Sequence, residues 1–256
     1  KDIVQLKHFL FNKYSFSRKA QREKEILCKA EHIIGRTDWD RRITSMLAPN
    51  ATYYHCDEVL RPTFYQEFWE PGEQKTKQKI ISTIGNNVYK GFETICETAI
   101  LLKDRLNFVW NVAGVEQNSQ IVRIVEKKLN HSIPYNVKLL GSIQEKKLVK
   151  ELLEADLYVH PAHIENSSNS VCEAMILGMP IIATFSGGTG SLLSDKVEGI
   201  LVQDGDPYAL AGAVLEIIKD MNKAVEYGKR ARAKALERHN KSRVVEELIG
   251  IYERIR

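Results

Sequence analysis

The sequence predicts an α/β protein whose sheet is doubly wound, mostly parallel and covered by helices on both faces. The main observation is that short apolar runs alternate with helical patterns from residue 79 onward, as in successive βαβ units. A second observation is that residues typical of helix ends separate these patterns. Gly178 and Pro180 end one helical pattern, as glycine just past a helix and proline shortly after it commonly do. Right-handed crossovers then place every strand-to-helix loop at one edge of the sheet.

The individual elements follow from this alternation. The apolar runs predict strands at 80–84, 108–113, 137–140, 157–159, 181–183 and 200–202. The patterns between them predict helices at 90–103, 117–129, 144–155, 169–178 and 207–219. Trp110 lies within one of the apolar runs, so we expect it in the core.

The first part of the chain has a different pattern. Its order is a charged helix at about 17–31, a strand at 32–35, a helix near 39–47 and a strand at 52–55. Two isolated strands do not form a stable sheet. We therefore predict that residues 1–70 are the end of a first domain with its linker, and the start at Lys1 rather than Met suggests a fragment.

Three further boundaries complete the predicted organisation. The segment 61–78 contains prolines and a glycine that are typical of a linker. Residues 71–220 form the second domain, and residues 221–256 form C-terminal helices with a break near His239 and Asn240. Asp38, at the start of the helix near 39–47, is predicted as its N-cap, with a place at the border of the interdomain cleft as the alternative.

Composition narrows the class of protein. The chain has 256 residues, 43% of them hydrophobic, and a net charge of +4. This charge is too small to indicate a nucleic-acid partner, but it suits an anionic ligand. The four cysteines are widely spaced, without a Cys-x-x-Cys pair, which predicts reduced thiols in a cytoplasmic protein. No apolar run reaches the roughly 20 residues of a membrane span.

Two carboxylates stand out where a predicted strand gives way to a helix. Glu165 and Glu173 have seven residues between them, and in open α/β sheets the crevice at this edge binds ligands. The helix start offers free N–H groups at Ser168, Asn169, Ser170 and Val171, which suit a diphosphate. The alternative is structural: Ser170 and Glu173 would form a capping box, and Glu165 would be an ordinary loop carboxylate.

The loop after the first strand of this domain supplies a cation. It contains Gly85, Asn86, Lys90 and Gly91, and Lys90 could present its charge to a diphosphate. An exposed lysine in a turn is the alternative. The loop is neither a Walker A sequence nor G-x-G-x-x-G, so a dinucleotide dehydrogenase is disfavoured.

Other loops at the same edge are candidates of lower specificity. Gly187 and Gly188 could present backbone N–H groups to an anion, or simply form a tight turn. Ser142 and Ile143 follow another strand end. His160 and His163 precede Glu165, but two histidines do not make a metal site, so structural or substrate-lining roles are expected.

These motifs resemble the retaining GT-B glycosyltransferases of the group 1, or family 4, type. The resemblance covers about residues 79–220 and rests on the E-x7-E spacing and on the sequences CEAMILGMPIIAT, SGGTG and GILVQDGDPYALAGAVLEII. It implies a Rossmann-like donor domain preceded by the remnant of a second Rossmann-like, acceptor-binding domain. It also implies that the C-terminal helices pack back on that first domain, and that no metal cofactor is needed.

The resemblance further implies roles for individual residues. Glu165 would lie against the transferred sugar, Glu173 would bind the ribose hydroxyls, and Lys90 would contact phosphate. Backbone near Ser142 and Ile143 would hold the nucleotide base. The chain departs from the family pattern at Asn86, where arginine is common, and at Ser191, where glutamate is common.

The implied function is retaining transfer of a hexose from a nucleoside diphosphate sugar to a saccharide or lipid-linked acceptor. Bacterial surface polysaccharide synthesis is the setting suggested by analogy. The alternatives are another GT-B enzyme, such as a nucleotide-sugar epimerase or a phosphorylase, and a degenerate nucleotide-sugar-binding module. The basic segment 229–234 would suit the inner face of a membrane, with an ordinary solvated helix face as the alternative.

Overall fold

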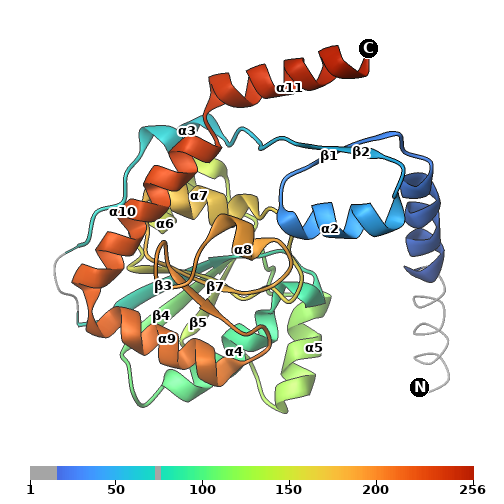
Figure 1. Cartoon of the computed structure of the whole chain (residues 1–256). Coiled ribbons are helices and arrows are strands. Elements are labelled where there is room, and N and C mark those ends of the chain that lie inside the picture. The colour runs from blue at the N-terminus through green and yellow to red at the C-terminus, as the bar shows by residue number, and fades with distance from the viewer. Residues whose placement is uncertain (1–15, 73–75) are drawn as a thin grey trace, which may run out of the picture.

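The computed structural model describes residues 16–72 and 76–256. Its larger unit is a six-stranded parallel sheet between two layers of helices, and a smaller unit with a two-stranded parallel sheet lies beside it (Figure 1). The predicted α/β class and doubly wound sheet are therefore confirmed.

The six strands form the order β5-β4-β3-β6-β7-β8. The chain runs outward from β3 through β4 to β5 at one edge of the sheet, and then crosses to the other side of β3, where β6, β7 and β8 follow in order. The strand order therefore reverses between β3 and β6. Such a switch point leaves a crevice at the carboxyl ends of the two strands. The strand bounds are β3 (Gln78–Thr83), β4 (Phe108–Ala113), β5 (Val137–Gly141), β6 (Leu157–His160), β7 (Ile181–Thr184) and β8 (Ile200–Val202).

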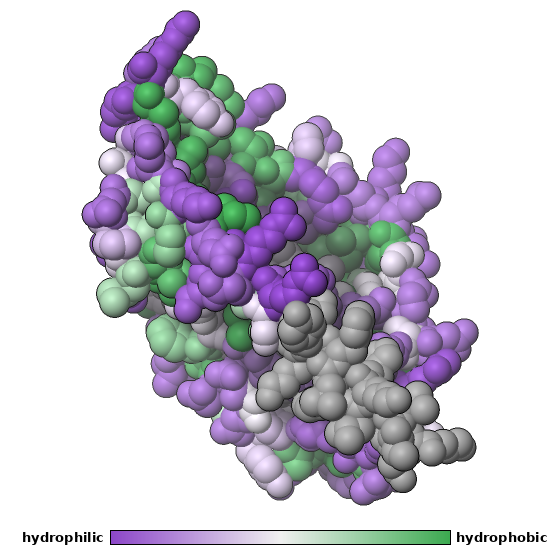
Figure 2. All heavy atoms as spheres, turned by 90° about the vertical axis from the view of Figure 1, so that its right-hand side faces the viewer, coloured by the Kyte–Doolittle hydropathy of each residue, from purple (hydrophilic) through white to green (hydrophobic). Residues whose placement is uncertain are grey.

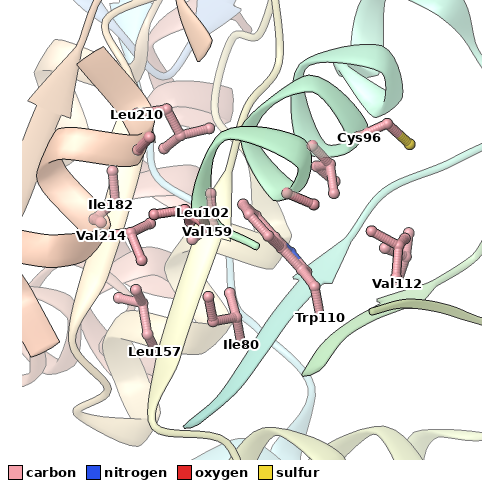
Figure 3. Close-up of a cluster of buried hydrophobic side chains, with 14 of the residues drawn as sticks. Ile80, Cys96, Leu102, Trp110, Val112, Leu157, Val159, Ile182, Leu210 and Val214 are labelled. Atoms are coloured by element: carbon pink, nitrogen blue, oxygen red, sulfur yellow. The ribbon is translucent and has the colours of Figure 1, made fainter. Parts of the chain in front are cut away.

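Each face of the sheet has its own apolar core. Trp110 of β4 is fully buried in the core beneath α4, α5 and α9, together with Leu102 and Val214 (Figure 3). The core on the other face contains residues of α3, α6, α7 and α10. The helix bounds are α3 (Pro62–Gln66), α4 (Phe92–Leu102), α5 (Gln120–Leu129), α6 (Glu145–Leu153), α7 (Asn169–Leu177), α9 (Pro207–Lys219) and α10 (Met221–Arg238).

Two short helices depart from the predicted elements. The helix α8 (Thr189–Leu192) occupies part of the turn predicted around Gly187 and Gly188. The helix α3 lies in the segment predicted as a linker, because Pro62 can occupy the first turn of a helix. Phe64 of α3 is fully buried, and the Trp69 indole N–H donates to the Ala155 carbonyl at 2.6 Å. This part of the segment is therefore docked on the large unit.

The smaller unit comprises the helix at 16–28, β1 (His32–Gly35), α2 (Asp38–Leu47) and β2 (Thr52–His55). The prediction of Asp38 as the N-cap of α2 is wrong. Thr37 is the N-cap, and its side chain forms a capping box with Asp40. The physical reason is that Thr37 has the extended backbone of an N-cap residue, whereas Asp38 is already the first helical residue.

The C-terminal helices connect the two units. Helix α10 packs on α7, and the chain then turns at His239 into α11 (Lys241–Ile255). Val244 and Ile251 of α11 pack against Cys56 and Tyr54 of the smaller unit. At the level of α11, Figure 2 shows hydrophobic side chains among hydrophilic ones. Ile249 and Tyr252 of α11 are exposed. Among the described residues, none of the helices is both long and apolar enough to cross a membrane.

Candidate functional site

A cleft of about 500 Å³ lies at the switch point of the sheet. Lys90 reaches it from the short 3-10 turn (Val88–Lys90) after β3, and Glu165 reaches it from the loop after β6. Lys90 Nζ lies 2.6 Å from Glu165 Oε2, so the cation and the carboxylate that the sequence singled out meet here. The lining residues are Arg36, Thr83, Ile84, Gly85, Lys90, Glu165, Ser167, Ser168, Asn169 and Ser170.

Glu165 is held as an anion. Burial by itself would raise its pKa, but hydrogen bonds from His160 and Lys90 outweigh that effect and lower the pKa to about 2. His160 Nε2 lies 3.2 Å from Glu165 Oε2, so it donates to the same oxygen as Lys90. The second oxygen, Oε1, receives no hydrogen bond from any residue in 16–72 or 76–256, which leaves it open to a ligand hydroxyl.

A glycine allows the two loops to meet. Gly91 has a φ of 75°, and a Cβ atom there would lie 1.9 Å from the carbonyl oxygen of Pro161. Only glycine combines this left-handed backbone with such a close approach. The His163 N–H donates to the Tyr89 carbonyl at 2.8 Å, which adds a second tie between the loops. Lys90 is therefore positioned by backbone packing as well as by its ion pair.

Gly187 and Gly188 lie against the loop that carries Glu165. A Cβ atom on Gly187, whose φ is 51°, would lie 1.9 Å from the Glu165 carbonyl oxygen. The Gly188 N–H donates to that same carbonyl at 2.9 Å, so it is not directed to an anion in this state. Neither glycine lines the cleft. They support the loop that carries Glu165.

The start of α7 has the features expected of an anion site. Ser168 is the N-cap residue, but its side chain makes no capping hydrogen bond. Within the described part of the chain, the backbone N–H groups of Asn169, Ser170 and Val171 have no acceptor. These groups and the helix dipole favour a bound anion. The alternative capping box is not formed, since the Ser170 hydroxyl contacts Ser168.

Glu173 lies in α7 but not on the wall of the cleft. Its side chain is buried and is held by both oxygens in a two-pronged ion pair with Arg61, at 2.7 and 2.8 Å. The charged carboxylate can be buried because the guanidinium donates hydrogen bonds to both of its oxygens. Sequence reasoning missed Arg61, which lies 112 residues from Glu173 in a segment without a motif.

The remaining predicted residues lie around the cleft. Asn86 is exposed next to Gly85 and does not line the cleft. Ser142 and Ile143 follow β5, and the Ser142 N–H donates to Glu116 Oε1 at 2.7 Å. His163 Nε2 lies 2.6 Å from Glu93 Oε1, which gives this histidine a partner within the protein.

Arg36 lines the cleft although no motif in the sequence suggested it. It follows β1, so it reaches the cleft from the smaller unit, and its Nε lies 3.2 Å from Glu58 Oε2. Ser191, where the family pattern has glutamate, accepts a hydrogen bond from the Asp38 N–H at 3.1 Å. Asp38 and Ser191 border a second cavity of about 560 Å³ between the units. The predicted alternative for Asp38, a place beside the interdomain cleft, matches this position.

The basic segment on α10 makes contacts within the protein. Arg232 donates to the carbonyl oxygens of Glu67 and Ile176, and its guanidinium lies over the Phe68 ring at 5.1 Å. Lys234 lies 3.4 Å from Glu198 Oε2. Contact of this segment with a membrane stays a prediction.

Lys90, Glu165 and the start of α7 thus meet at the switch point of a doubly wound α/β sheet, which is where proteins of this fold class bind ligands. The family profile described as glycosyl transferases group 1 matches residues 65–234. The chain belongs to this family.

Individual relatives agree with this assignment. An uncharacterized glycosyltransferase of Methanocaldococcus jannaschii is 25% identical over 189 residues, which cover 72% of this chain and 47% of that protein. The chain thus spans about half the length of this curated relative.

Solved structures show the GT-B fold. Sucrose-phosphate synthase of Thermosynechococcus elongatus matches with a TM-score of 0.75 and 20% identity, over 91% of this chain and 60% of that one. The Anabaena protein HepE, solved in complex with UDP and glucose, matches with a TM-score of 0.72 and 18% identity, over 88% and 63%.

Proposed function

We propose that this chain carries the nucleotide-sugar half of a retaining glycosyltransferase, which moves a hexose from a nucleoside diphosphate sugar to a saccharide or lipid-linked acceptor. The observation that carries the proposal is the meeting of Lys90 and Glu165 at the switch point. Beside them lie the N–H groups at the start of α7, which have no acceptor among residues 16–72 and 76–256. Synthesis of a bacterial surface polysaccharide is the setting that the family resemblance suggests.

The leaving diphosphate would bind between Lys90 and the start of α7. When the bond from the anomeric carbon to the diphosphate oxygen breaks, both electrons stay on the diphosphate. Lys90 Nζ and the N–H groups of Asn169, Ser170 and Val171 would stabilise that charge, which is the kind of preorganised electrostatics that usually contributes most to catalysis. The acceptor oxygen then bonds to the same face of the sugar, and its proton passes to the departing phosphate.

Glu165 would face the sugar. Its pKa of about 2 keeps it negatively charged at neutral pH, which suits the positive charge that develops on the sugar ring. The unoccupied Oε1 oxygen could accept a sugar hydroxyl. Arg36 could supply positive charge in place of the arginine that is common where this chain has Asn86, because Arg36 lines the same cleft.

Glu173 would accept hydrogen bonds from the ribose hydroxyls, and the nucleotide base would lie near Ser142 and Ile143. The ribose must share Glu173 with Arg61 or displace it, because both carboxylate oxygens are now bonded to the guanidinium. The complex of the similar HepE structure with UDP and glucose supports a nucleoside diphosphate donor.

Calorimetric titration with UDP, GDP and ADP, and then with their sugars, tests the donor site. We expect selective binding of one base that weakens in both Lys90→Ala and Glu173→Ala. Absence of binding to every nucleotide would contradict the proposal. Product analysis then tests the reaction: an epimerase would convert the donor sugar without an acceptor, whereas a retaining transferase forms an α-linked product from an α-linked donor only when an acceptor is present.

A further inference from the structure

Three side chains of metal-binding type converge outside the proposed donor cleft. A carboxylate oxygen of Glu58, Sγ of Cys172 and a ring nitrogen of His239 all lie within 4.8 Å of one another. All three residues are buried, and Cys172 and His239 are fully so. They come from three distant segments: the chain after β2, helix α7 and the turn between α10 and α11.

The hydrogen bond of His239 fixes which nitrogen is available. Nδ1 lies 2.8 Å from the carbonyl oxygen of Glu58, and only a protonated nitrogen can donate there. The neutral ring therefore carries its lone pair on Nε2, and this buried atom has no hydrogen-bond partner among residues 16–72 and 76–256. A backbone carbonyl that orients a histidine in this way is a common support of metal ligands.

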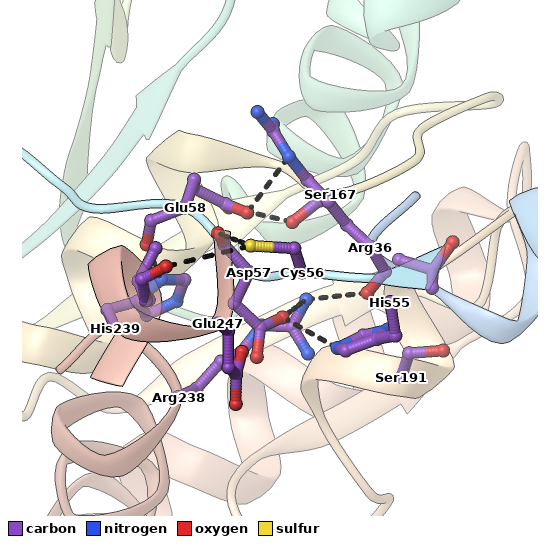
Figure 4. A network of polar contacts seen from close by, with 12 residues as sticks. Arg36, His55, Cys56, Asp57, Glu58, Ser167, Ser191, Arg238, His239 and Glu247 are labelled. Atoms are coloured by element: carbon purple, nitrogen blue, oxygen red, sulfur yellow. Dashed lines mark hydrogen bonds and ion pairs between the residues drawn. The ribbon is translucent and has the colours of Figure 1, made fainter. Parts of the chain in front are cut away.

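Glu58 is held in place from the side of the cleft. The Ser167 hydroxyl donates to its Oε1 at 2.8 Å, and Arg36 Nε lies 3.2 Å from its Oε2 in an ion pair that does not have the geometry of a hydrogen bond (Figure 4). The nearby cation Arg238 is already paired with Asp57 at 2.6 Å. Glu58 thus has Arg36 as its charged partner, but its Oε2 receives no hydrogen bond from any described residue.

Among the described residues, two polar atoms of this cluster, His239 Nε2 and Glu58 Oε2, have no hydrogen-bond partner. Buried polar atoms nearly always have partners, so an unpartnered imidazole nitrogen beside a thiol and a carboxylate requires an explanation. A divalent ion would provide one, since thiolate, neutral imidazole and carboxylate together are a ligand set of Zn²⁺. Tetrahedral ligands at zinc bond lengths lie about 3.5 Å apart, so the side chains would have to close by at most about 1.3 Å.

We propose that Glu58, Cys172 and His239 bind one Zn²⁺ ion, with a water molecule as the fourth ligand. None of the three ligands lines the proposed donor cleft. Binding releases the thiol proton of Cys172 to solvent and forms bonds from Sγ, Nε2 and a carboxylate oxygen to the metal. The ion links α7 to two chain segments that cross between the units, the one after β2 and the turn between α10 and α11. Through the contacts of Glu58 it also fixes Ser167 and Arg36 at the cleft.

Metal titration of the chelator-treated protein tests this site. The protein carries Cys28→Ser to remove the exposed thiol, and Co²⁺ is added as a spectroscopic probe. We expect one Co²⁺ per chain, with the visible bands of tetrahedral cobalt and a near-ultraviolet charge-transfer band from a thiolate. One equivalent of Zn²⁺ should abolish these bands, and native mass spectrometry should show one zinc per chain.

Variants identify the ligands. Cys172→Ser and His239→Asn should lose the cobalt bands and the rise in thermal unfolding midpoint that Zn²⁺ produces, whereas Cys96→Ser, at another buried thiol, should retain both. If either ligand variant is unfolded by circular dichroism, Glu58→Gln takes its place. Absence of a thiolate band, or an unchanged band in Cys172→Ser, would overturn the proposal.

Discussion

Lys90 Nζ and Glu165 Oε2 lie 2.6 Å apart, although the two residues are 75 positions apart in the chain. They lie in the loops that follow two neighbouring strands, β3 and β6, on opposite sides of the point where the strand order reverses. The pair thus marks the crevice in which open α/β sheets bind ligands. It also gives Glu165 a second role, since this carboxylate holds the proposed phosphate-binding lysine before any ligand arrives.

Replacement of Lys90 should reduce both donor binding and turnover. Lys90→Ala removes the cation proposed to stabilise the leaving diphosphate, so we expect kcat to fall by about 10²–10³-fold. Lys79→Ala is a matched control. Lys79 lies near the other end of β3, is similarly shielded from solvent and is paired with Glu154 at 2.8 Å. Steady-state kinetics measures kcat, and calorimetry measures donor affinity. Equal losses of donor affinity in the two variants would contradict the assignment.

Glu165 should stabilise the folded chain at neutral pH and cease to do so in acid. Burial opposes its ionisation, but hydrogen bonds from His160 and Lys90 lower its pKa from 4.5 to about 2. A carboxylate with a depressed folded-state pKa contributes stability above its unfolded pKa, and this is lost as the pH falls through the folded value. The window therefore runs from pH 4.5 down to about 2, and the contribution is about 1–3 kcal/mol.

Urea unfolding of Glu165→Gln and the unmodified chain from neutral pH to about pH 3 measures this effect. The glutamine variant should be less stable at neutral pH, and the difference between the two proteins should shrink as the pH falls below 4.5. A difference that stays constant with pH would show that the stabilisation does not depend on the charge of Glu165.

Loss of Arg61 should destabilise the fold by leaving Glu173 buried without its counterion. We expect Arg61→Ala to cost about 1–3 kcal/mol, since it leaves the buried carboxylate of Glu173 without its counterion, whereas the Arg61 side chain itself is 41% exposed. Arg61→Ala combined with Glu173→Gln should therefore cost less than the sum of the two single changes. Chemical denaturation of the four proteins measures the coupling energy, and strict additivity would contradict the prediction.

Gly187 should be intolerant of a side chain. Alanine there would combine a φ of 51° with a Cβ atom 1.9 Å from the Glu165 carbonyl. We expect Gly187→Ala to destabilise the protein by about 2–3 kcal/mol and to weaken donor binding by displacing the Glu165 loop. Gly212→Ala in α9 is the control, because no atom lies within 4 Å of its Cβ position. It should stabilise by about 0.5–1 kcal/mol, as alanine in place of a helical glycine does.

The sequence by itself determined the sheet, its helices and the two loops that meet at the cleft. These features depend on local patterns: the apolar runs of β3 to β8, the glycines that end strands and helices, and the rule that parallel strands expose their following loops at one edge. Lys90 and Glu165 could therefore be assigned to one crevice without coordinates.

Only the tertiary structure decided which partners these residues have. Arg61 meets Glu173 across 112 positions, and Arg36 reaches the cleft from another unit. The convergence of Glu58, Cys172 and His239 likewise depends on three segments that no local pattern links. The physical reason is that a periodic pattern fixes which face of an element is buried, whereas the contacts of a polar side chain depend on how distant elements pack against one another.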